Sequence, residues 1–430
     1  MEFSPSSCGL MEKQKRFIRI IDRCKKSNIF AKQFGRERQM IKEINIKNFK
    51  SIVDLTLDLG RFNVIIGANG CGKTNILEAV AFAAAANMRK LDNEFLINRD
   101  LRLAKPELMV NAFEEGSYEM SEGPLKEFSN GVFYVGISEE GKKDRQVAVA
   151  YNGFENKWAN MSPYVNQEDY ELIKKVQGTV LDEEVMGDNL EVIRKNRPED
   201  FYRLIALFQT PKSEINSFLI YHPTEKHLKE VKDSPIFPLG IRGEGLLQYL
   251  KDKSQQTDYK GMFESINEGL GMLDWFDGVV VPGDLLNNEY KLSIGDRYLR
   301  DSMHFFDQRS TNEGFMFLLF YLTLFNSKDT PPFFSIDNIE TALNPRLCTE
   351  LTSRLIHTAK EKNKQVILTT HSPFVLDGLD LSDDQVRLFV ARRDIDGHTR
   401  IERVIYREDR NMPLSELWMS GLIGGLPDNF

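Results

Sequence analysis

Cysteine is scarce in this sequence, and the four that occur, Cys8, Cys24, Cys71 and Cys348, lie far apart and form no C-x-x-C pair. This spacing favours neither a disulfide framework nor a zinc site, and it fits the reducing cytoplasm. Long apolar runs are missing, so no membrane-spanning helix is expected, and neither is a secretory leader. With 41% hydrophobic and 28% charged residues, the composition is that of a soluble globular protein.

Positive charge is in short supply, since 56 Lys and Arg stand against 64 Asp and Glu, giving a net charge of −8. A protein that binds nucleic acid over its whole surface is therefore not expected. The exception is a basic N-terminal extension, residues 1–39. Its charge is compatible with contact to DNA or to an acidic neighbouring subunit, and also with a solvated helical arm. These alternatives stay open.

The most informative segment is a glycine-rich loop that fills every fixed position of the pattern G-x-x-x-x-G-K-[ST]. A β-branched run at 62–66 precedes it, and a strong helix-forming segment at 75–84 follows it. A strand, a glycine loop and a helix in this order bind nucleotide phosphates, because backbone N–H groups and the positive end of the helix point at the anion. Lys73 is expected to reach the β- and γ-phosphates, and Thr74 to ligate Mg²⁺. The predicted nucleotide-binding residues of the loop are Gly67, Asn69, Gly70, Cys71, Gly72, Lys73, Thr74 and Asn75.

An acidic motif stands in the C-terminal half. The apolar segment 333–337 ends in Asp337, the arrangement by which phosphate-loop ATPases hold Mg²⁺. The apolar segment 365–370 is followed by His371, which is placed to hydrogen-bond a γ-phosphate or to orient the attacking water. Taken alone, an Asp that caps a turn and a structural His explain these residues as well.

A third motif precedes an apolar helix expected at 315–322. Ser310, Glu313 and Gly314 form the pattern S-x-x-E-G, and we expect them at a helix N-terminus, which favours an anion. A plain N-cap is the alternative explanation.

The hydrophobic pattern also predicts a coarse order of elements. Alternating segments at 41–50 and 55–59 indicate strands that lead into the phosphate-loop strand. Strands and helices alternate in the C-terminal half, which indicates a βαβ pattern with a parallel sheet. The remaining predictions are a hairpin at 132–137 and 146–151, helical segments at 165–212, 243–271 and 345–362, and strands at 218–221, 290–294 and 387–390.

The order of these motifs resembles the head of an ABC-type ATPase, and more narrowly the branch of RecF, SMC and OLD proteins. The resemblance rests on I-x-I-x-N-F-K-S-I at 44–52, G-x-N-G-x-G-K-T-N at 67–75 and T-H-S-P at 370–373. It implies an α/β fold with a mixed or parallel sheet and a helical insertion. The ATPase domain is then split between 40–155 and 300–430, with a helical insertion or lid plus connecting strands at 156–299.

In this family two heads meet face to face, and each ATP lies between the phosphate loop of one head and the S-x-x-E-G segment of the other. The resemblance therefore implies ATP and Mg²⁺ as cofactors. It also implies a homo-oligomer of at least two copies, in which Ser310 and Gly314 act on the neighbour's nucleotide.

The chain departs from the family at the carboxylate strand. Where the family has D-E-x-E, this sequence has Asp337-Asn338-Ile339-Glu340, and Asn338 cannot act as a general base. Loss of a general base costs about 10²–10⁴ in rate. Either Glu340 substitutes for it or hydrolysis is slow, which we favour. The predicted catalytic residues are Glu340, His371 and Asn338, and the family's γ-phosphate-sensing glutamine has no candidate, because Gln146 lies in mid-strand.

The resemblance also narrows the function. The insertion is too short and too often broken by Pro and Gly for the heptads of an SMC arm, and no room is expected after His371 for the nuclease module of an OLD protein. What remains resembles the stand-alone ATPase subunits of bacterial anti-phage systems such as Septu and PARIS, which assemble with a separately encoded effector such as a nuclease. The alternatives are a RecF-like DNA repair ATPase and a metabolic phosphoryl transferase.

Overall fold

The chain is described here by a computed structural model over residues 39–111, 131–152, 157–177, 192–231, 234–283, 285–286, 289–300, 305–407 and 412–426. The predicted basic extension lies outside these residues, apart from Gln39. In the order of the chain, the strands are β1 (Ile41–Phe49), β2 (Ile52–Asp58), β3 (Phe62–Ile66), β4 (Val132–Glu139), β5 (Arg145–Asn152), β6 (Lys157–Asn160), β7 (Ile220–Tyr221), β8 (Phe276–Val280), β9 (Ser293–Asp296), β10 (Phe333–Ile336), β11 (Gln365–Thr369), β12 (Val386–Arg393) and β13 (Thr399–Val404).

The helices are α2 (Lys73–Asn87), α3 (Asn93–Ile97), α4 (Pro106–Met109), α5 (Gln167–Gln177), α7 (Pro198–Leu207), α8 (Glu225–Lys229), α9 (Leu246–Ser254), α10 (Lys260–Leu270), α11 (Glu313–Asn326), α12 (Pro345–Glu361), α13 (Pro373–Leu376) and α14 (Leu414–Met419). Short 3₁₀ helices occur at Ser162–Tyr164, Glu214–Ser217 and Thr257–Tyr259. Within the described residues, no helix is both long and apolar enough to span a bilayer.

An antiparallel sheet forms one side of the molecule, with the strand order β2-β1-β4-β5-β6. Its strands alternate as the sequence predicts, so that one face is apolar and packs inward. The predicted hairpin is confirmed as β4 and β5, whose register pairs Val135 with Val147. On the outer face, α5 and α7 cover Tyr134 and Ala150 with Ile173 and Leu204. Part of the predicted helical insertion therefore serves as the cover of this sheet.

A second, mixed sheet has the order β13-β12-β3-β11-β10-β7. All neighbours in it are parallel except β12 and β13. Because β3 pairs with β11 and β12, the phosphate-loop half and the C-terminal half share one sheet. Strands β1 and β2 precede β3 along the chain, as predicted, but they pair in the antiparallel sheet and not beside β3.

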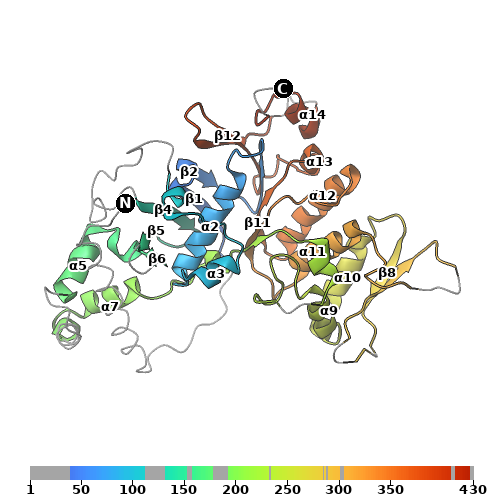
Figure 1. The fold of residues 1–430 in the computed structure, drawn as a ribbon, viewed down its shortest axis with the longest axis horizontal. Helices are drawn as coiled ribbons and strands as arrows, with labels where there is room; N and C mark the ends of the chain where they lie inside the picture. Colours follow the sequence, from blue (N-terminus) through green and yellow to red (C-terminus); the bar gives the residue numbers. More distant parts are fainter. Residues whose placement is uncertain are drawn as a thin grey trace.

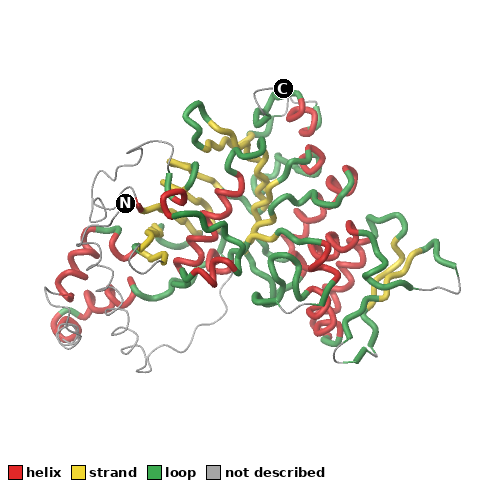
Figure 2. The backbone as a smooth tube through the Cα atoms, in the orientation of Figure 1, coloured by secondary structure: helices red, strands yellow, loops and turns green. Residues whose placement is uncertain are grey.

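Helix α2 fills the space between the two sheets. It is apolar on almost every side, and it packs against β1, β4, β5 and β6 on one side and β7 and β11 on the other. Figure 1 shows α2 between the labels of β1 and β11, and Figure 2 shows strands gathered in the middle of the molecule with helices on both sides. The expected α/β fold with a mixed sheet is confirmed.

The other face of the mixed sheet is covered by α9 to α12. Side chains alternate along β11, so that Ile367 joins the core around α2 while Val366 and Leu368 join the core around α11. Helix α11 is buried from Phe315 to Asn326, which confirms the apolar helix predicted at 315–322. Its burial on all sides makes it the fixed support on which the neighbouring loops rest.

Several short strands were missed or misplaced by the hydrophobic pattern. The strand predicted at 290–294 is β9, at Ser293–Asp296, and its partner β8 was not predicted. Strands β6 and β13 were missed as well, and β7 has only two residues. Residues 157–299 thus supply β6 to one sheet and β7 to the other, besides their helices. Such short strands are stabilised by their neighbours in the sheet and carry little pattern of their own.

Candidate nucleotide site

Three of the predicted motifs meet at one edge of the mixed sheet. The phosphate loop follows β3, Asp337 follows β10 and His371 comes two residues after β11. These strands are parallel neighbours, so their carboxyl ends lie together, and the register aligns Ile65 with Thr369 and Ile336 with Leu368. Ligands of open α/β sheets bind at this edge.

The phosphate loop has the backbone that its glycines permit. Gly67, Gly70 and Gly72 have φ values of 148°, 75° and 104°. At Gly72 a Cβ atom would lie 2.1 Å from Thr399 Oγ1, so no side chain fits there. Helix α2 begins directly after Gly72 and has no side-chain cap, which leaves its first N–H groups available to an anion.

Lys73 is held inside this loop. Its Nζ donates to the carbonyl oxygens of Gly67 and Ala68 at 2.7 and 3.1 Å. The side chain is buried, and this burial lowers the pKa of Lys73 from its ordinary value. A phosphate in the loop would restore a counter-charge to this ammonium group.

The residues predicted to hold Mg²⁺ lie together. Thr74 Oγ1 donates to Asp337 Oδ2 at 3.2 Å, and Asp337 Oδ1 accepts a hydrogen bond from the Thr369 hydroxyl. A hydroxyl and a carboxylate next to a phosphate site are the hard oxygen donors that Mg²⁺ prefers. The donor set therefore fits this ion.

The two residues that replace the family's acidic motif are both in place but differ in chemistry. Asn338 has φ of 56°, and its N–H donates to Thr369 Oγ1. Glu340 accepts from the Thr370 hydroxyl and from the N–H of His371, both at 2.8 Å. Both carboxylate oxygens of Glu340 thus accept hydrogen bonds. These bonds restrict the ability of Glu340 to take a proton from water.

His371 lies beside this carboxylate at the exposed end of the loop after β11. Partial desolvation, and next the charge of Lys73, lower the pKa of His371 below its ordinary value of 6.5. The neutral imidazole carries one N–H and one acceptor nitrogen near neutral pH. It is therefore able to donate to a phosphate oxygen without adding a charge.

The third motif lies elsewhere. Helix α11 starts at Glu313, and Asn312 is its N-cap, with its side chain accepting from the N–H of Phe315 at 2.8 Å. Ser310 lies in the preceding turn, exposed, where its hydroxyl donates to Asp307 Oδ1. The prediction that Ser310 lies at the helix N-terminus is therefore wrong by two residues. The N-cap is Asn312, whose side-chain oxygen accepts the hydrogen bond from the first turn of α11.

Within the described residues, no hydrogen bond or ion pair joins Ser310, Glu313 or Gly314 to the phosphate loop. Gly314 instead approaches the loop that follows Asp337, where a Cβ atom on it would lie 3.0 Å from Ala342 O. One copy of the chain therefore brings together the phosphate-loop residues, Asp337, Asn338, Glu340 and His371, and leaves the α11 motif outside this group.

Long-range contacts that the sequence reasoning missed support the phosphate loop. Ser51 and Thr399 share a hydrogen bond of 2.7 Å, Thr399 donates to Cys71 O at 2.9 Å, and Asn75 donates to Ser51 Oγ at 2.8 Å. The N-F-K-S motif was the signal that could have pointed to Ser51. Thr399 had no signal, because it lies 328 positions from Cys71.

The N-F-K-S motif also supplies Lys50 to a buried ion cluster. Glu78 on α2 is almost fully buried and binds Lys50 Nζ at 2.6 Å and Arg102 Nε at 2.7 Å. Arg102 also donates to Asn75 Oδ1 at 3.2 Å. The loop after α3 is thereby fixed to the first turns of α2, next to the phosphate loop.

The C-terminal segment rests on the phosphate loop, which the sequence did not indicate. A Cβ atom on Gly425 would lie 2.6 Å from Val390 Cγ1, 3.5 Å from Gly67 Cα and 3.5 Å from Trp418 Nε1. Gly425 has φ of 80°, which favours glycine. Figure 1 shows α14 beside α13, and the two helices pack together. The turn after α14 thus reaches the first glycine of the loop.

The position beside Asp337 at the sheet edge is occupied by histidine. Tyr221 of β7 pairs with Ile336, and the next residue, His222, contacts Asp100 Oδ2 through Nε2 at 2.7 Å. Arg242 binds the other oxygen of Asp100 at 2.7 Å. Gln146 lies in β5 of the other sheet, so it is remote from this edge by topology.

Comparison with known proteins is consistent with this geometry. Residues 43–270 match a family model described as AAA domain. Residues 308–377 match a second AAA domain model, of the AbiEii toxin type from type IV TA systems. The two matches together span the phosphate loop, Asp337 and His371.

The sequence is also similar to three individual proteins. An ATP/GTP phosphatase of Helicobacter pylori is 21% identical over 378 residues, which cover 83% of this chain and 93% of that protein. The DNA replication and repair protein RecF of Actinobacillus pleuropneumoniae is 30% identical over 105 residues, covering 24% of this chain and 28% of RecF. The OLD nuclease of Thermus scotoductus is 46% identical over 41 residues, covering 10% of this chain and 8% of that protein.

Two solved structures are similar to this chain, with TM-scores of 0.48 and 0.41. An SMC head bound to the C-winged helix domain of ScpA has a TM-score of 0.48 at 14% identity, covering 85% of this chain and 98% of that chain. The SMC head domain from Thermotoga maritima has a TM-score of 0.41 at 17% identity, covering 86% of this chain and 100% of that chain.

Proposed function

Because the chain belongs to the AAA domain family, as a RecF-, SMC- and OLD-like ABC-type ATPase, we propose that it binds Mg·ATP between two copies of itself and hydrolyses it slowly. In this proposal the ATP-held assembly controls a separately encoded effector, such as a nuclease or toxin, in defence against phage.

One observation carries the proposal. The phosphate loop, Asp337, Glu340 and His371 converge at one sheet edge, whereas Ser310 is exposed and Ser310 and Gly314 make no hydrogen bond to the phosphate loop within the described residues. A helix N-terminus with an exposed serine ahead of it suits a phosphate presented by another molecule. A second copy supplies that phosphate if two heads face each other.

The residues at the sheet edge have distinct tasks in this proposal. Lys73 and the first N–H groups of α2 bind the β- and γ-phosphates, and Thr74 and Asp337 hold Mg²⁺. When bound, Mg²⁺ offsets the negative charge of the phosphates. His371 donates to the γ-phosphate, and Asn338 orients water but cannot take its proton. Glu340 is then the available base, and its two hydrogen bonds restrain it.

Control of an effector is the finer part of the proposal. Slow hydrolysis suits a protein whose nucleotide state sets an assembly, since the bound state then persists. The description of the family that matches residues 308–377 names a toxin of a type IV TA system, so a related AAA domain belongs to a system with a toxic component.

The mass of the protein in solution tests the shared site. We expect light scattering to show ATP- and Mg²⁺-dependent assembly of the wild type. Ser310→Arg should bind ATP as the wild type does but stay unassembled, because the bulky cation blocks the partner's nucleotide. Ser382→Arg is the matched control, because Ser382 is also an exposed serine bonded to an Asp but lies ahead of β12 at the opposite sheet edge. Assembly of Ser310→Arg equal to that of Ser382→Arg contradicts the proposal.

A second candidate function follows from the RecF similarity, namely a DNA-binding repair ATPase. Binding of the isolated chain to DNA that is stimulated by ATP and falls steeply with salt would favour it. Assembly with ATP but no DNA binding would favour the effector-control function.

A further inference from the structure

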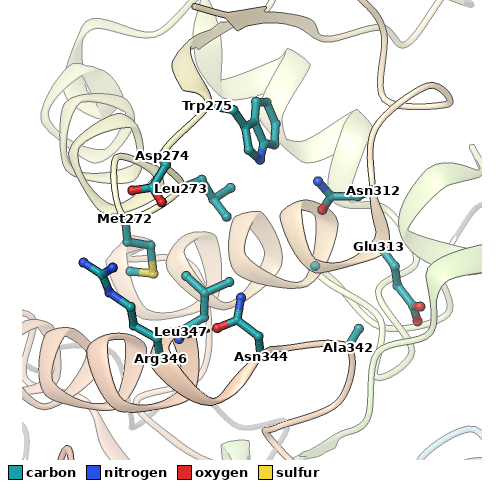
Figure 3. Close-up of a pocket in the computed structure, with 11 residues that line it drawn as sticks. Met272, Leu273, Asp274, Trp275, Asn312, Glu313, Ala342, Asn344, Arg346 and Leu347 are labelled. Carbon is teal, nitrogen blue, oxygen red and sulfur yellow. Dashed lines mark hydrogen bonds between the residues drawn. The ribbon is translucent and has the colours of Figure 1, made fainter. Parts of the chain in front are cut away.

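A pocket of about 480 Å³ opens beside the start of α11. It lies between the turn that follows α10, the first residues of α11 and the loop that leads into α12. Figure 3 shows Trp275 on one side and Asn344, Leu347 and Arg346 on the other. Leu273 contributes further apolar surface, so the pocket combines an apolar interior with a charged rim.

The pocket is structurally well supported. The half-buried Trp275 packs on Phe306 and Phe315, with ring centroids 6.0 and 5.8 Å away. Phe315 belongs to the fully buried part of α11. The walls are therefore held by the core and do not have to form when a ligand arrives, which favours binding.

An exposed apolar side chain stands beside the phosphate loop of the same chain. Ile395, at the tip of the β12–β13 turn, is 99% exposed. Arg393, just before the turn, donates from Nε to Gly70 O of the phosphate loop at 3.0 Å. Asp394 closes the turn, since its Oδ1 accepts from the N–H groups of Asp396 and His398. Ile395 is thus presented on a fixed turn next to the nucleotide site.

We propose that Ile395 of each copy inserts into the Trp275 pocket of a second copy, and that Asp396 pairs there with Arg346 at the pocket rim. The inference rests on the proposed function, because pairing the phosphate loop of one copy with the start of α11 in the other brings these two features toward each other. Two-fold symmetry then forms the contact twice.

A charge pair at Arg346, the basic residue of a lining that also holds Asp274 and Glu313, favours a second copy as the occupant. Asp396 follows Ile395 in the turn, and Arg346 lies at the pocket, both exposed. Over the described part of the chain, neither side chain takes part in an ion pair. A contact that unites an apolar anchor with an opposite charge pair at its rim has the arrangement of a specific interface.

Substitutions of Ile395 test the apolar anchor. We expect Ile395→Glu to raise the dissociation constant of the ATP-held dimer about 100-fold, because a buried isoleucine is lost at two symmetric contacts. The control is Ile405→Glu, since Ile405 is 59% exposed but lies just after β13, beyond the far end of the hairpin. The dimer of Ile405→Glu should have the same dissociation constant as that of the wild type. Analytical ultracentrifugation with Mg²⁺ and a non-hydrolysable ATP analogue measures this constant.

A charge exchange tests the partner. Asp396→Arg and Arg346→Asp should each weaken the dimer about tenfold, and the two changes in one chain should restore it. Affinity of each variant for the ATP analogue at low protein concentration shows whether the fold and the phosphate loop are intact. Absence of rescue overturns the proposed pair, and an Ile395→Glu dimer as tight as the wild type overturns the anchor. Both outcomes leave the shared nucleotide site standing, because that site is tested separately by ATP-dependent assembly of the wild type and of Ser310→Arg.

Discussion

The phosphate loop and the start of α11 differ in how far one chain completes them. Around the loop, Lys73, Asp337 and Glu340 each make hydrogen bonds to neighbouring residues, of 2.7, 3.2 and 2.8 Å. At the start of α11, Ser310 and Glu313 are exposed, and a pocket opens next to them. One region is thus preformed for phosphate binding, whereas the other is exposed, and we propose that a second copy covers it.

The largest effect is expected in the preformed region, on the rate of ATP hydrolysis, at Asn338, where the family has a general base. Asn338→Glu restores a carboxylate next to Asp337, and we expect ATP hydrolysis to rise about 10²-fold or more, as for a regained general base. The measurement is steady-state phosphate release. Asn338→Gln is the matched control, since it has the same length and the same cost at a positive φ but no base. Equal rates for the two variants would show that the missing base does not limit hydrolysis.

Lys73 tests the same region through binding. Lys73→Ala removes a buried ammonium group that would contact two phosphates, and charged hydrogen bonds are worth about 1.5–3 kcal/mol each. ATP affinity measured by calorimetry should fall about 10²-fold. Lys105→Ala, at an exposed position outside the loop, should leave affinity unchanged. Wild-type affinity in Lys73→Ala would place the nucleotide elsewhere.

Substitutions in the C-terminal segment should have a smaller effect, on stability. They separate the cost of backbone strain from the cost of a steric contact with Val390. Gly425 and Gly424 have φ values of 80° and 74°, so alanine costs about 1–2 kcal/mol in backbone strain at either position. Only at Gly425 does a Cβ also press on Val390 Cγ1, at 2.6 Å against 3.9 Å for Gly424. Gly425→Ala should be less stable to denaturant than Gly424→Ala by about 1–3 kcal/mol, and it should bind ATP more weakly. Equal stability of the two variants would mean that the segment moves away without cost.

The pH dependence of ATP binding is the smallest effect. Desolvation and Lys73 lower the pKa of His371 in the free protein, and a bound triphosphate raises it again. Because the pKa is higher in the bound state, binding takes up a proton, and affinity rises by less than about tenfold as the pH falls through and below 6.5. Calorimetry in two buffers of different ionisation enthalpy measures this uptake. His371→Gln retains the proton uptake of ATP itself but should lose the part due to the imidazole. An unchanged uptake would remove His371 from the site.

Local signals in the sequence were sufficient for much of this structure. The phosphate loop, the strands that end at Asp337 and His371, and α12 were predicted almost to the residue, because turn glycines, apolar runs and a Pro at the start of a helix act over a few neighbours. The site residues at the sheet edge were predicted from motifs that follow apolar segments and from the order of these motifs along the chain.

The features that could not be predicted depend on distant parts of the chain. Thr399 reaches Cys71, Gly425 reaches Gly67 and His222 reaches Asp100, and nothing in the local pattern marks these residues. The short strands β6, β8 and β13 were missed for the same reason, since pairing and not propensity stabilises them. The cap of α11 was misjudged by two residues because Ser310 and Asn312 are both good N-cap residues.

Mixing two inactive variants tests the shared site most directly. Lys73→Ala lacks the phosphate-binding lysine, and Ser310→Arg lacks the surface that covers the partner's nucleotide. Neither should assemble or hydrolyse ATP alone, but a mixture forms one complete site from Lys73 of one chain and Ser310 of the other. We predict that the mixture regains ATP-dependent assembly and phosphate release. A mixture that stays as inactive as its components would contradict a site built by two copies of this chain.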